Sequence, residues 1–151
     1  MIEKKSGYVV NISSAAVLAG LYGHTAYAPS KYAVLGFSRC LRTELKSHGI
    51  YVSVVLPQDT DTPQLAFERK LLPEITQKIN ELIEKIFGSA STISADKAAD
   101  FIIAGMNKHK FRILFGFEGQ FAALIAPLLD KLFFWYAVHL AKKESLNNNG
   151  K

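Results

Sequence analysis

The sequence is short of the residues that build cross-linked or metal-bound folds. It contains a single cysteine, Cys40, which excludes an internal disulfide framework and leaves no pair of thiols to hold a metal ion. A reducing compartment therefore suits the chain, and no metal site is predicted. Because Cys40 falls within a predicted helix, we expect its thiol to pack against apolar neighbours.

A long uninterrupted apolar run is also missing. The first apolar segment is too short for a secretory signal, and no stretch reaches the roughly 18 uncharged apolar residues of a membrane-spanning helix. The net charge of +5 comes from scattered basic residues without an Arg-rich run, so nucleic acid is not an expected partner. With 151 residues, of which 49% are hydrophobic, the chain has the size and composition of one globular domain.

The order of the apolar segments predicts an α/β fold. Residues 8–12 and 50–56 are short β-branched runs typical of buried strands, whereas residues 26–46 carry apolar side chains at helical spacing and are stopped by Gly49. A strand, a helix and a second strand form a crossover, so the two strands should be parallel.

Further elements follow a polar turn at residues 58–63. We predict one amphipathic helix over residues 65–87, a second helix over 94–106 with Ser94 as its N-cap, and a strand over 111–115. The three strands are expected to be parallel neighbours, with residues 8–12 at an exposed edge of the sheet.

Tyr27 and Lys31 lie four residues apart, which places their side chains on one face of the first predicted helix. A tyrosine that donates a proton near neutral pH needs a neighbouring cation to stabilise its phenolate, and a lysine one turn away supplies it. The same ammonium can bind a sugar hydroxyl. Taken alone, this spacing is also that of an ordinary surface pair.

Ser14 adds a second group to this arrangement. It comes directly after the first strand, where open parallel sheets place ligand-binding residues, and its hydroxyl can hold a carbonyl oxygen while Tyr27 protonates it. The alternative is that Ser13 and Ser14 only satisfy backbone groups in a turn.

Three segments resemble the short-chain dehydrogenase/reductase superfamily in order and spacing. They are Asn11-Ile12-Ser13-Ser14, Tyr27-Ala28-Pro29-Ser30-Lys31 and Leu56-Pro57-Gln58-Asp59-Thr60-Asp61-Thr62-Pro63. The resemblance implies the C-terminal half of a doubly wound parallel-sheet, Rossmann-type fold. It also implies that Ser14 orients the carbonyl, that Tyr27 donates the proton, and that Lys31 both lowers the tyrosine pKa and binds the nicotinamide ribose.

The same resemblance implies further cofactor contacts in the turn after the second strand. There the superfamily holds the nicotinamide end, so Pro57, Thr60 and Thr62 join Tyr27 and Lys31 as expected cofactor-binding residues. Gln58 stands where glycine is common, which makes the backbone path at this point harder to predict.

Within the superfamily, residues 59–63 and the segment Phe115-Gly116-Phe117-Glu118-Gly119 resemble the 3-ketodihydrosphingosine reductases. This resemblance implies NADPH-dependent reduction of a lipid ketone in sphingolipid synthesis, at a membrane facing the cytosol, which is the endoplasmic reticulum in a eukaryote. In other cells a cytoplasmic location is expected. The alternatives are a reductase of a steroid, retinoid or fatty-acyl ketone, or an inactive fragment that only associates with a membrane or a subunit.

The glycine-rich turn that cradles the cofactor pyrophosphate in this superfamily is missing from the sequence. Gly20 and Gly23 are interpreted as loop geometry instead. We therefore expect residues 1–118 to be a partial catalytic domain without its N-terminal cofactor half, and the isolated chain to be inactive.

An apolar C-terminal segment, residues 119–143, is predicted to be helical. Pro127, Asp130 and Lys131 interrupt it, so an interfacial helix with Trp135 near lipid headgroups is favoured over a membrane span. Packing on the body of the protein or on a second subunit of a homo-oligomer is the alternative. Residues 144–151 are expected to be a loose polar tail.

Overall fold

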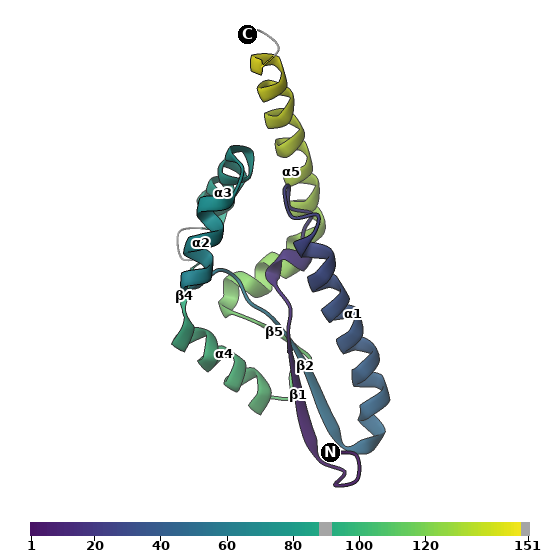
Figure 1. The fold of residues 1–151 in the computed structure, drawn as a ribbon. Helices are drawn as coiled ribbons and strands as arrows, with labels where there is room; N and C mark the ends of the chain where they lie inside the picture. Colours follow the sequence, from purple (N-terminus) through teal and green to yellow (C-terminus); the bar gives the residue numbers. More distant parts are fainter. Residues whose placement is uncertain (88–91, 149–151) are drawn as a thin grey trace.

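A three-stranded parallel sheet forms the centre of the computed structural model, which describes residues 1–87 and 92–148 (Figure 1). Its strands are β1 (Gly7–Ile12), β2 (Ile50–Leu56) and β5 (Arg112–Leu114), in the order β1-β2-β5. β1 pairs with β2 along its whole length, and β5 pairs with the last part of β2, both in parallel. The predicted parallel neighbours are confirmed, with β1 at an edge of this sheet.

Helix α1 (Tyr27–Leu45) makes the crossover between β1 and β2. A short 3-10 turn, Lys46–His48, follows it and ends at Gly49, whose φ of 69° lies in the left-handed region that favours glycine. A Cβ at this position would also lie 2.5 Å from the carbonyl oxygen of Lys5. The predicted stop at Gly49 is therefore confirmed.

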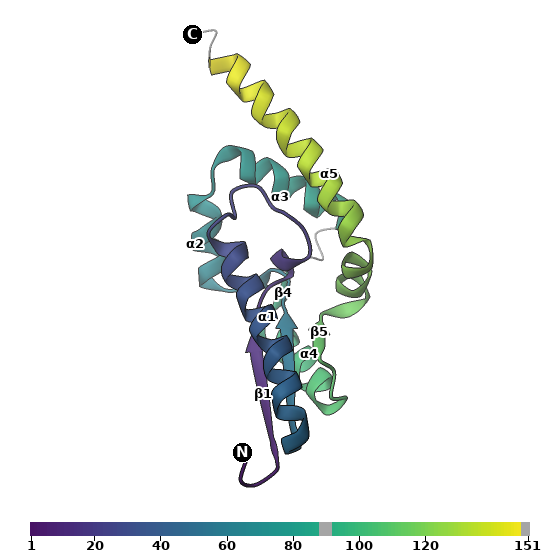
Figure 2. The same cartoon turned by 90° about the vertical axis from the view of Figure 1, so that its right-hand side faces the viewer.

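The sheet is covered on both faces, by α1 on one side and by α4 (Ala95–Asn107) on the other (Figures 1 and 2). Val54 and Val55 are both fully buried, and because successive side chains of a strand point to opposite faces, they enter different clusters. Val54 packs with Leu35 of α1, whereas Val55 packs with Ala98 of α4. This double cover explains why β2 is mainly apolar on both faces.

The prediction of a single helix over residues 65–87 is wrong. The structure has two helices, α2 (Pro63–Leu71) and α3 (Glu74–Phe87). The break falls at Leu72, which has an extended ψ of 136° because the residue before a proline, here Pro73, disfavours helical backbone. The apolar spacing continues across the break, which is why the sequence pattern concealed it.

A second, two-stranded sheet was not predicted. Its strands are β3 (Thr60–Asp61) and β4 (Ile93–Ser94), which pair in parallel. Ser94 then begins α4, and its Oγ accepts a hydrogen bond from the backbone N–H of Lys97 at 3.3 Å. The predicted N-cap is confirmed.

Helix α5 (Gly116–Asn148) contains Pro127 and extends away from the sheet toward the C-terminus (Figure 1). It contacts α3. Residues 144–148, expected to belong to a loose polar tail, continue this helix. Residues 149–151 lie outside the described residues. Across residues 1–87 and 92–148, no helix combines the length and the apolarity needed to cross a membrane.

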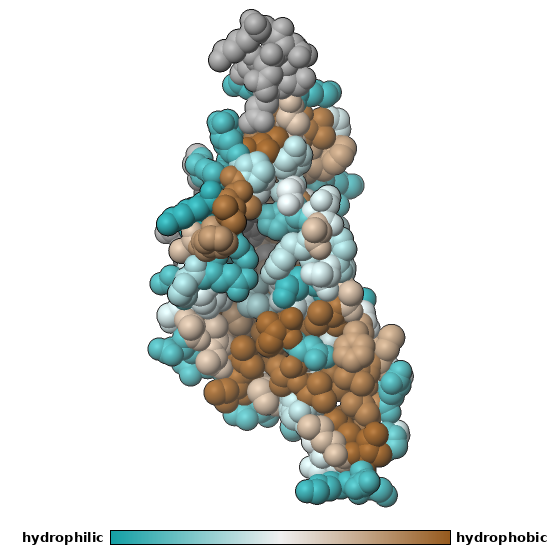
Figure 3. Space-filling model, in the orientation of Figure 1, coloured by the Kyte–Doolittle hydropathy of each residue, from teal (hydrophilic) through white to brown (hydrophobic). Residues whose placement is uncertain are grey.

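The outer side of α1 is open to solvent. Cys40 is exposed, so the expectation that its thiol packs against apolar neighbours is wrong, and Phe37 on the same helix is 59% exposed. Leu35 and Ser38 are the buried residues of this helix, because only the face toward β2 is covered. Apolar surface also gathers over the half of the molecule that holds the sheet (Figure 3).

Candidate active site

The candidate site lies where the parallel strands β1 and β2 end. Beyond β1, the backbone N–H of Ser13 donates to the carbonyl of Val55 at 2.9 Å, and that of Ala15 donates to the carbonyl of Pro57 at 2.8 Å. These bonds hold the segment after β1 beside the segment after β2. Carboxyl ends of parallel strands are where open α/β sheets bind ligands.

Ser14 makes a local hydrogen bond, as the turn interpretation expected, whereas Ser13 bonds to a residue on α1 that is 18 positions further along the chain. The buried Ser13 donates its hydroxyl to the backbone carbonyl of Lys31 at 2.8 Å and so ties the end of β1 to α1. Ser14 is the N-cap of a 3-10 helix, Ala15–Val17, and its Oγ accepts from the N–H of Ala16 at 3.1 Å. Because that Oγ is used as an acceptor, its own proton remains available for a carbonyl oxygen.

Tyr27 and Lys31 lie together at the start of α1. The Lys31 Nζ is 5.4 Å from the centre of the Tyr27 ring, and the Tyr27 side chain is 40% exposed at this end of the sheet. This distance is that of a cation–π contact, so the ammonium lies over the phenol ring. Within the described part of the chain, no hydrogen bond joins Ser14 to Tyr27, so the structure brings the tyrosine and lysine together and places the serine after the neighbouring strand end.

His24 is a neighbour of Tyr27 that the sequence analysis missed. The two rings meet edge to face, with centroids 6.1 Å apart and planes at 72°. Nδ1 of His24 lies 3.1 Å from the carbonyl of Tyr22, and the carbonyl of His24 accepts from the N–H of Ala28 in the first turn of α1. The sequence did hold a sign of this contact, because His24 comes three residues, about one helical turn, before Tyr27.

The residues expected to contact a cofactor after β2 are engaged in local hydrogen bonds. Pro57 follows β2 directly; Thr60 donates its hydroxyl to the carbonyl of Gln58 at 3.2 Å. Thr62 is the N-cap of α2, where its Oγ1 accepts from the N–H of Leu65 at 3.3 Å. Thr60 can still accept and Thr62 can still donate, so this donor set fits the polar nicotinamide end of a dinucleotide.

The glycines between Ser14 and Tyr27 have structural neighbours. Gly23 has a φ of 81°, and a Cβ there would lie 2.6 Å from Oγ1 of Thr76 on α3. The N–H of Gly20 donates to the carboxylate of Asp130 at 2.7 Å. These contacts agree with the interpretation that Gly20 and Gly23 shape the loop and do not bind phosphate.

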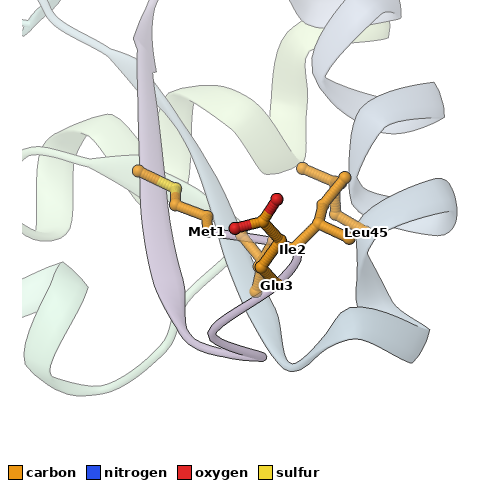
Figure 4. Close-up of a pocket in the computed structure, with 5 residues that line it drawn as sticks. Met1, Ile2, Glu3 and Leu45 are labelled. Atoms are coloured by element: carbon orange, nitrogen blue, oxygen red, sulfur yellow. The ribbon is translucent and has the colours of Figure 1, made fainter.

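A shallow hollow lies away from these residues (Figure 4). Met1, Ile2, Glu3, Leu45 and Ile50 line it. Ile50 is the first residue of β2, so the hollow is at the opposite end of the strand from Pro57 and does not belong to the candidate site. In residues 1–87 and 92–148, no cluster of metal-ligating side chains occurs.

Comparison of the sequence with known proteins shows a family. The short chain dehydrogenase family matches residues 1–71. A 3-ketodihydrosphingosine reductase of Dictyostelium discoideum is 34% identical over 136 residues, which cover 89% of this chain and 39% of that protein. A 3-dehydrosphinganine reductase of Danio rerio is 35% identical over 119 residues, covering 79% and 34%. The chain therefore spans about a third of the length of these curated relatives.

Solved structures share the fold. Levodione reductase superposes with a TM-score of 0.64 at 26% identity, over 82% of this chain and 49% of that chain. A short-chain dehydrogenase from Streptomyces avermitilis gives a TM-score of 0.63 at 24% identity, over 100% of this chain and 55% of that chain. The matching sequence, the parallel sheet and the placement of Tyr27 beside Lys31 together identify this chain as a member of the short-chain dehydrogenase/reductase superfamily that resembles the 3-ketodihydrosphingosine reductases.

Proposed function

We propose that this chain carries the proton-transfer site of an NADPH-dependent reductase that converts 3-ketodihydrosphingosine to dihydrosphingosine. The observation that carries the proposal is the position of Lys31 Nζ 5.4 Å from the Tyr27 ring at the ligand-binding edge of the sheet. The substrate follows from the relatives, which are named for this reaction.

Each of the three residues has one task in the reaction. The nicotinamide, when bound, supplies a hydride to the carbonyl carbon. The Ser14 hydroxyl donates a hydrogen bond that holds the carbonyl oxygen, and the Tyr27 hydroxyl transfers its proton to that oxygen, which completes the alcohol. Lys31 stabilises the phenolate left on Tyr27 until a proton returns.

Cofactor binding is assigned to the same edge. Tyr27 and Lys31 would hold the nicotinamide ribose, to whose hydroxyls the Lys31 ammonium would donate. Pro57, Thr60 and Thr62 border the nicotinamide end, where the Thr62 hydroxyl proton and the Thr60 oxygen are available for its polar groups. The choice of NADPH over NADH rests on the resemblance to the reductases of sphingoid bases.

Helix α5 is proposed to rest on a lipid surface facing the cytosol. Its exposed apolar side chains recur at helical spacing, with Leu124 77%, Leu128 68% and Trp135 71% exposed, and Lys142 and Lys143 are exposed further along. Apolar side chains with neighbouring lysines suit an anionic membrane. In a eukaryotic cell the proposed location is the endoplasmic reticulum.

Vesicle sedimentation tests the membrane proposal. The chain should sediment with anionic phospholipid vesicles, and Leu128→Glu should reduce the bound fraction at least fivefold because a carboxylate enters the apolar contact. Formation of a dimer, with no binding to vesicles, would instead support the alternative of a second subunit.

A hybrid enzyme tests the reductase proposal. Residues 1–118 replace the matching part of the Dictyostelium discoideum relative, whose remaining sequence supplies the rest of the cofactor site. The hybrid should reduce 3-ketodihydrosphingosine with NADPH, and Tyr27→Phe should lower kcat by about 10²–10⁴-fold by removing the proton donor. Steroid, retinoid and fatty-acyl ketones are assayed in parallel.

Tyr32→Phe is the matched control, because Tyr32 lies on the same helix with 49% of its side chain exposed. It should leave turnover unchanged. A hybrid that folds and binds NADPH but reduces no ketone would contradict the proposal, and preference for one of the other ketones would move the assignment to another reductase of the superfamily.

A further inference from the structure

Asp130 lies near the middle of helix α5, in a mainly apolar part of the sequence that it and Lys131 interrupt. Its Oδ1 accepts a hydrogen bond from the backbone N–H of Gly20 at 2.7 Å. Gly20 belongs to the loop that connects Ser14 with Tyr27, so this bond joins α5 to the segment between two residues of the proposed site. Hydrogen bonds from an N–H to a carboxylate are stronger than those between neutral groups.

Apolar packing beside this bond holds the same part of the loop. Ala19 is 7% exposed and Phe133 of α5 is 4% exposed, and the two form one buried cluster with Leu21 and Ile125 at its border. A Cβ on Gly20 would lie 3.0 Å from the carboxylate oxygen, so a glycine suits the close approach. The carboxylate of Asp130 therefore fixes the loop at Gly20, beside the apolar contact between Ala19 and Phe133.

The far end of the loop is held in turn by α3 and α1. Gly23 lies against the buried Thr76, and the carbonyl of His24 accepts from the N–H of Ala28 at 2.8 Å. The segment from Gly20 to the first turn of α1 is thus held at Gly20, Gly23 and His24, while Tyr22, Thr25 and Ala26 between them are exposed. Tyr27 is the first residue of that helix, so the loop that begins at Gly20 leads directly into it.

From this geometry we infer that Asp130 is a positioning residue, which holds the loop between Ser14 and Tyr27 and thereby sets the place of the Tyr27 phenol. The role given to Asp130 rests on the proposed function, but the contacts that hold the loop do not depend on which substrate is bound. Because Asp130 is exposed, the bond adds little to the overall stability, and its effect is local. Proton transfer is sensitive to displacements of about 1 Å, so a local shift of the Tyr27 phenol is enough to slow the reaction.

The experiment uses the full 151-residue chain and three variants. Asp130→Ala removes the acceptor, Asp130→Asn keeps an acceptor oxygen without the charge, and Lys131→Ala removes the adjacent exposed charge as a matched control. Amide hydrogen exchange is measured for Gly20, with β2 as an internal reference, and NMR signals of ¹³C-labelled tyrosine rings report on Tyr27. The Tyr27 signal is assigned with Tyr27→Phe.

Asp130→Ala should speed exchange at Gly20 about tenfold and shift the Tyr27 ring signal, while exchange in β2 and the Tyr51 signal stay as they are. Asp130→Asn should restore most of the protection and the Tyr27 signal, and Lys131→Ala should change neither. The rescue by asparagine distinguishes a positioned acceptor from general damage to α5.

Unchanged exchange at Gly20 in Asp130→Ala would overturn the inference. So would faster exchange without a change at Tyr27, an equal effect of Lys131→Ala, or failure of Asp130→Asn to rescue. None of these measurements uses turnover, so a hybrid that fails to reduce ketones would contradict the proposed function and leave this result unaffected.

Discussion

The Lys31 ammonium lies 5.4 Å from the centre of the Tyr27 ring. The backbone of the same lysine is also fixed, because its carbonyl accepts a hydrogen bond from the hydroxyl of the buried Ser13 at 2.8 Å. The end of β1 therefore anchors the helical turn that carries both groups. This contact fixes the backbone from which the Lys31 side chain extends over the Tyr27 ring.

Lys31→Ala should impair the hybrid enzyme in two ways. Loss of the ammonium removes both the stabilisation of the phenolate and a donor to the nicotinamide ribose, so kcat should fall by about 10²–10⁴-fold and the KM for NADPH should rise. Steady-state kinetics over a range of NADPH concentrations measure both effects.

Lys46→Ala is the control for this substitution. The Nζ of Lys46 also lies 5.4 Å from a tyrosine ring, that of Tyr51, but at the other end of the sheet. Its removal should leave the kinetics unchanged. Equal losses in the two variants would show that a lysine above a tyrosine matters for stability rather than for chemistry.

The three strands of the main sheet and the Tyr27–Lys31 pair were predictable from the sequence because each depends on local spacing. β2 is a β-branched run, and a tyrosine and a lysine four residues apart must share a helical face. The contacts that complete the site join distant segments. The bond between Gly20 and Asp130 spans 110 residues, so the sequence shows Asp130 only as a charge that interrupts an apolar helix.

Gly105→Ala should destabilise the fold by about 1–2 kcal/mol. A Cβ on Gly105 would lie 2.7 Å from Cδ1 and Cγ1 and 2.9 Å from Cγ2 of Ile113, a residue that is 2% exposed. Overpacking of a buried contact outweighs the gain in helix propensity. In the Ile113→Ala background, Gly105→Ala should no longer be destabilising, and urea denaturation of the four proteins of this cycle measures the coupling.

Gly36→Ala should have the opposite effect on the free energy of unfolding and stabilise the fold. Gly36 lies within α1, and no atom lies within 4 Å of a Cβ built on it, so only the change in helix propensity remains. The substitution should stabilise the fold by about 0.5–1 kcal/mol in the same denaturation experiment. Destabilisation at Gly36 would indicate that the outer face of α1 is covered in solution.

The start of α3 should respond to acid. Lys78 lies one turn from Glu74, with 2.6 Å between Nζ and Oε1, and its hydrogen bond and charge lower the pKa of the Glu74 carboxyl below the usual value of about 4.5. Since the folded-state pKa is the lower one, the pair stabilises the fold above the unfolded pKa. That contribution is lost as the pH falls through the folded pKa. In Lys78→Met, an NMR titration should show the Glu74 pKa raised; an unchanged titration would remove Lys78 as the cause.

The 151-residue chain should bind NADPH weakly by itself. Its sequence holds no glycine-rich turn for the pyrophosphate, and both glycines of the loop before Tyr27 are used otherwise, with the N–H of Gly20 bound to Asp130 and Gly23 packed against Thr76. The groups assigned to the cofactor reach only its nicotinamide end. Charge-assisted contacts to phosphates are among the strongest in such sites, so the affinity should be lower than that of the hybrid enzyme by on the order of 10³-fold. Calorimetric titration of both proteins with NADPH measures the difference, and equally tight binding would show that this chain recognises the phosphates with residues not assigned to them.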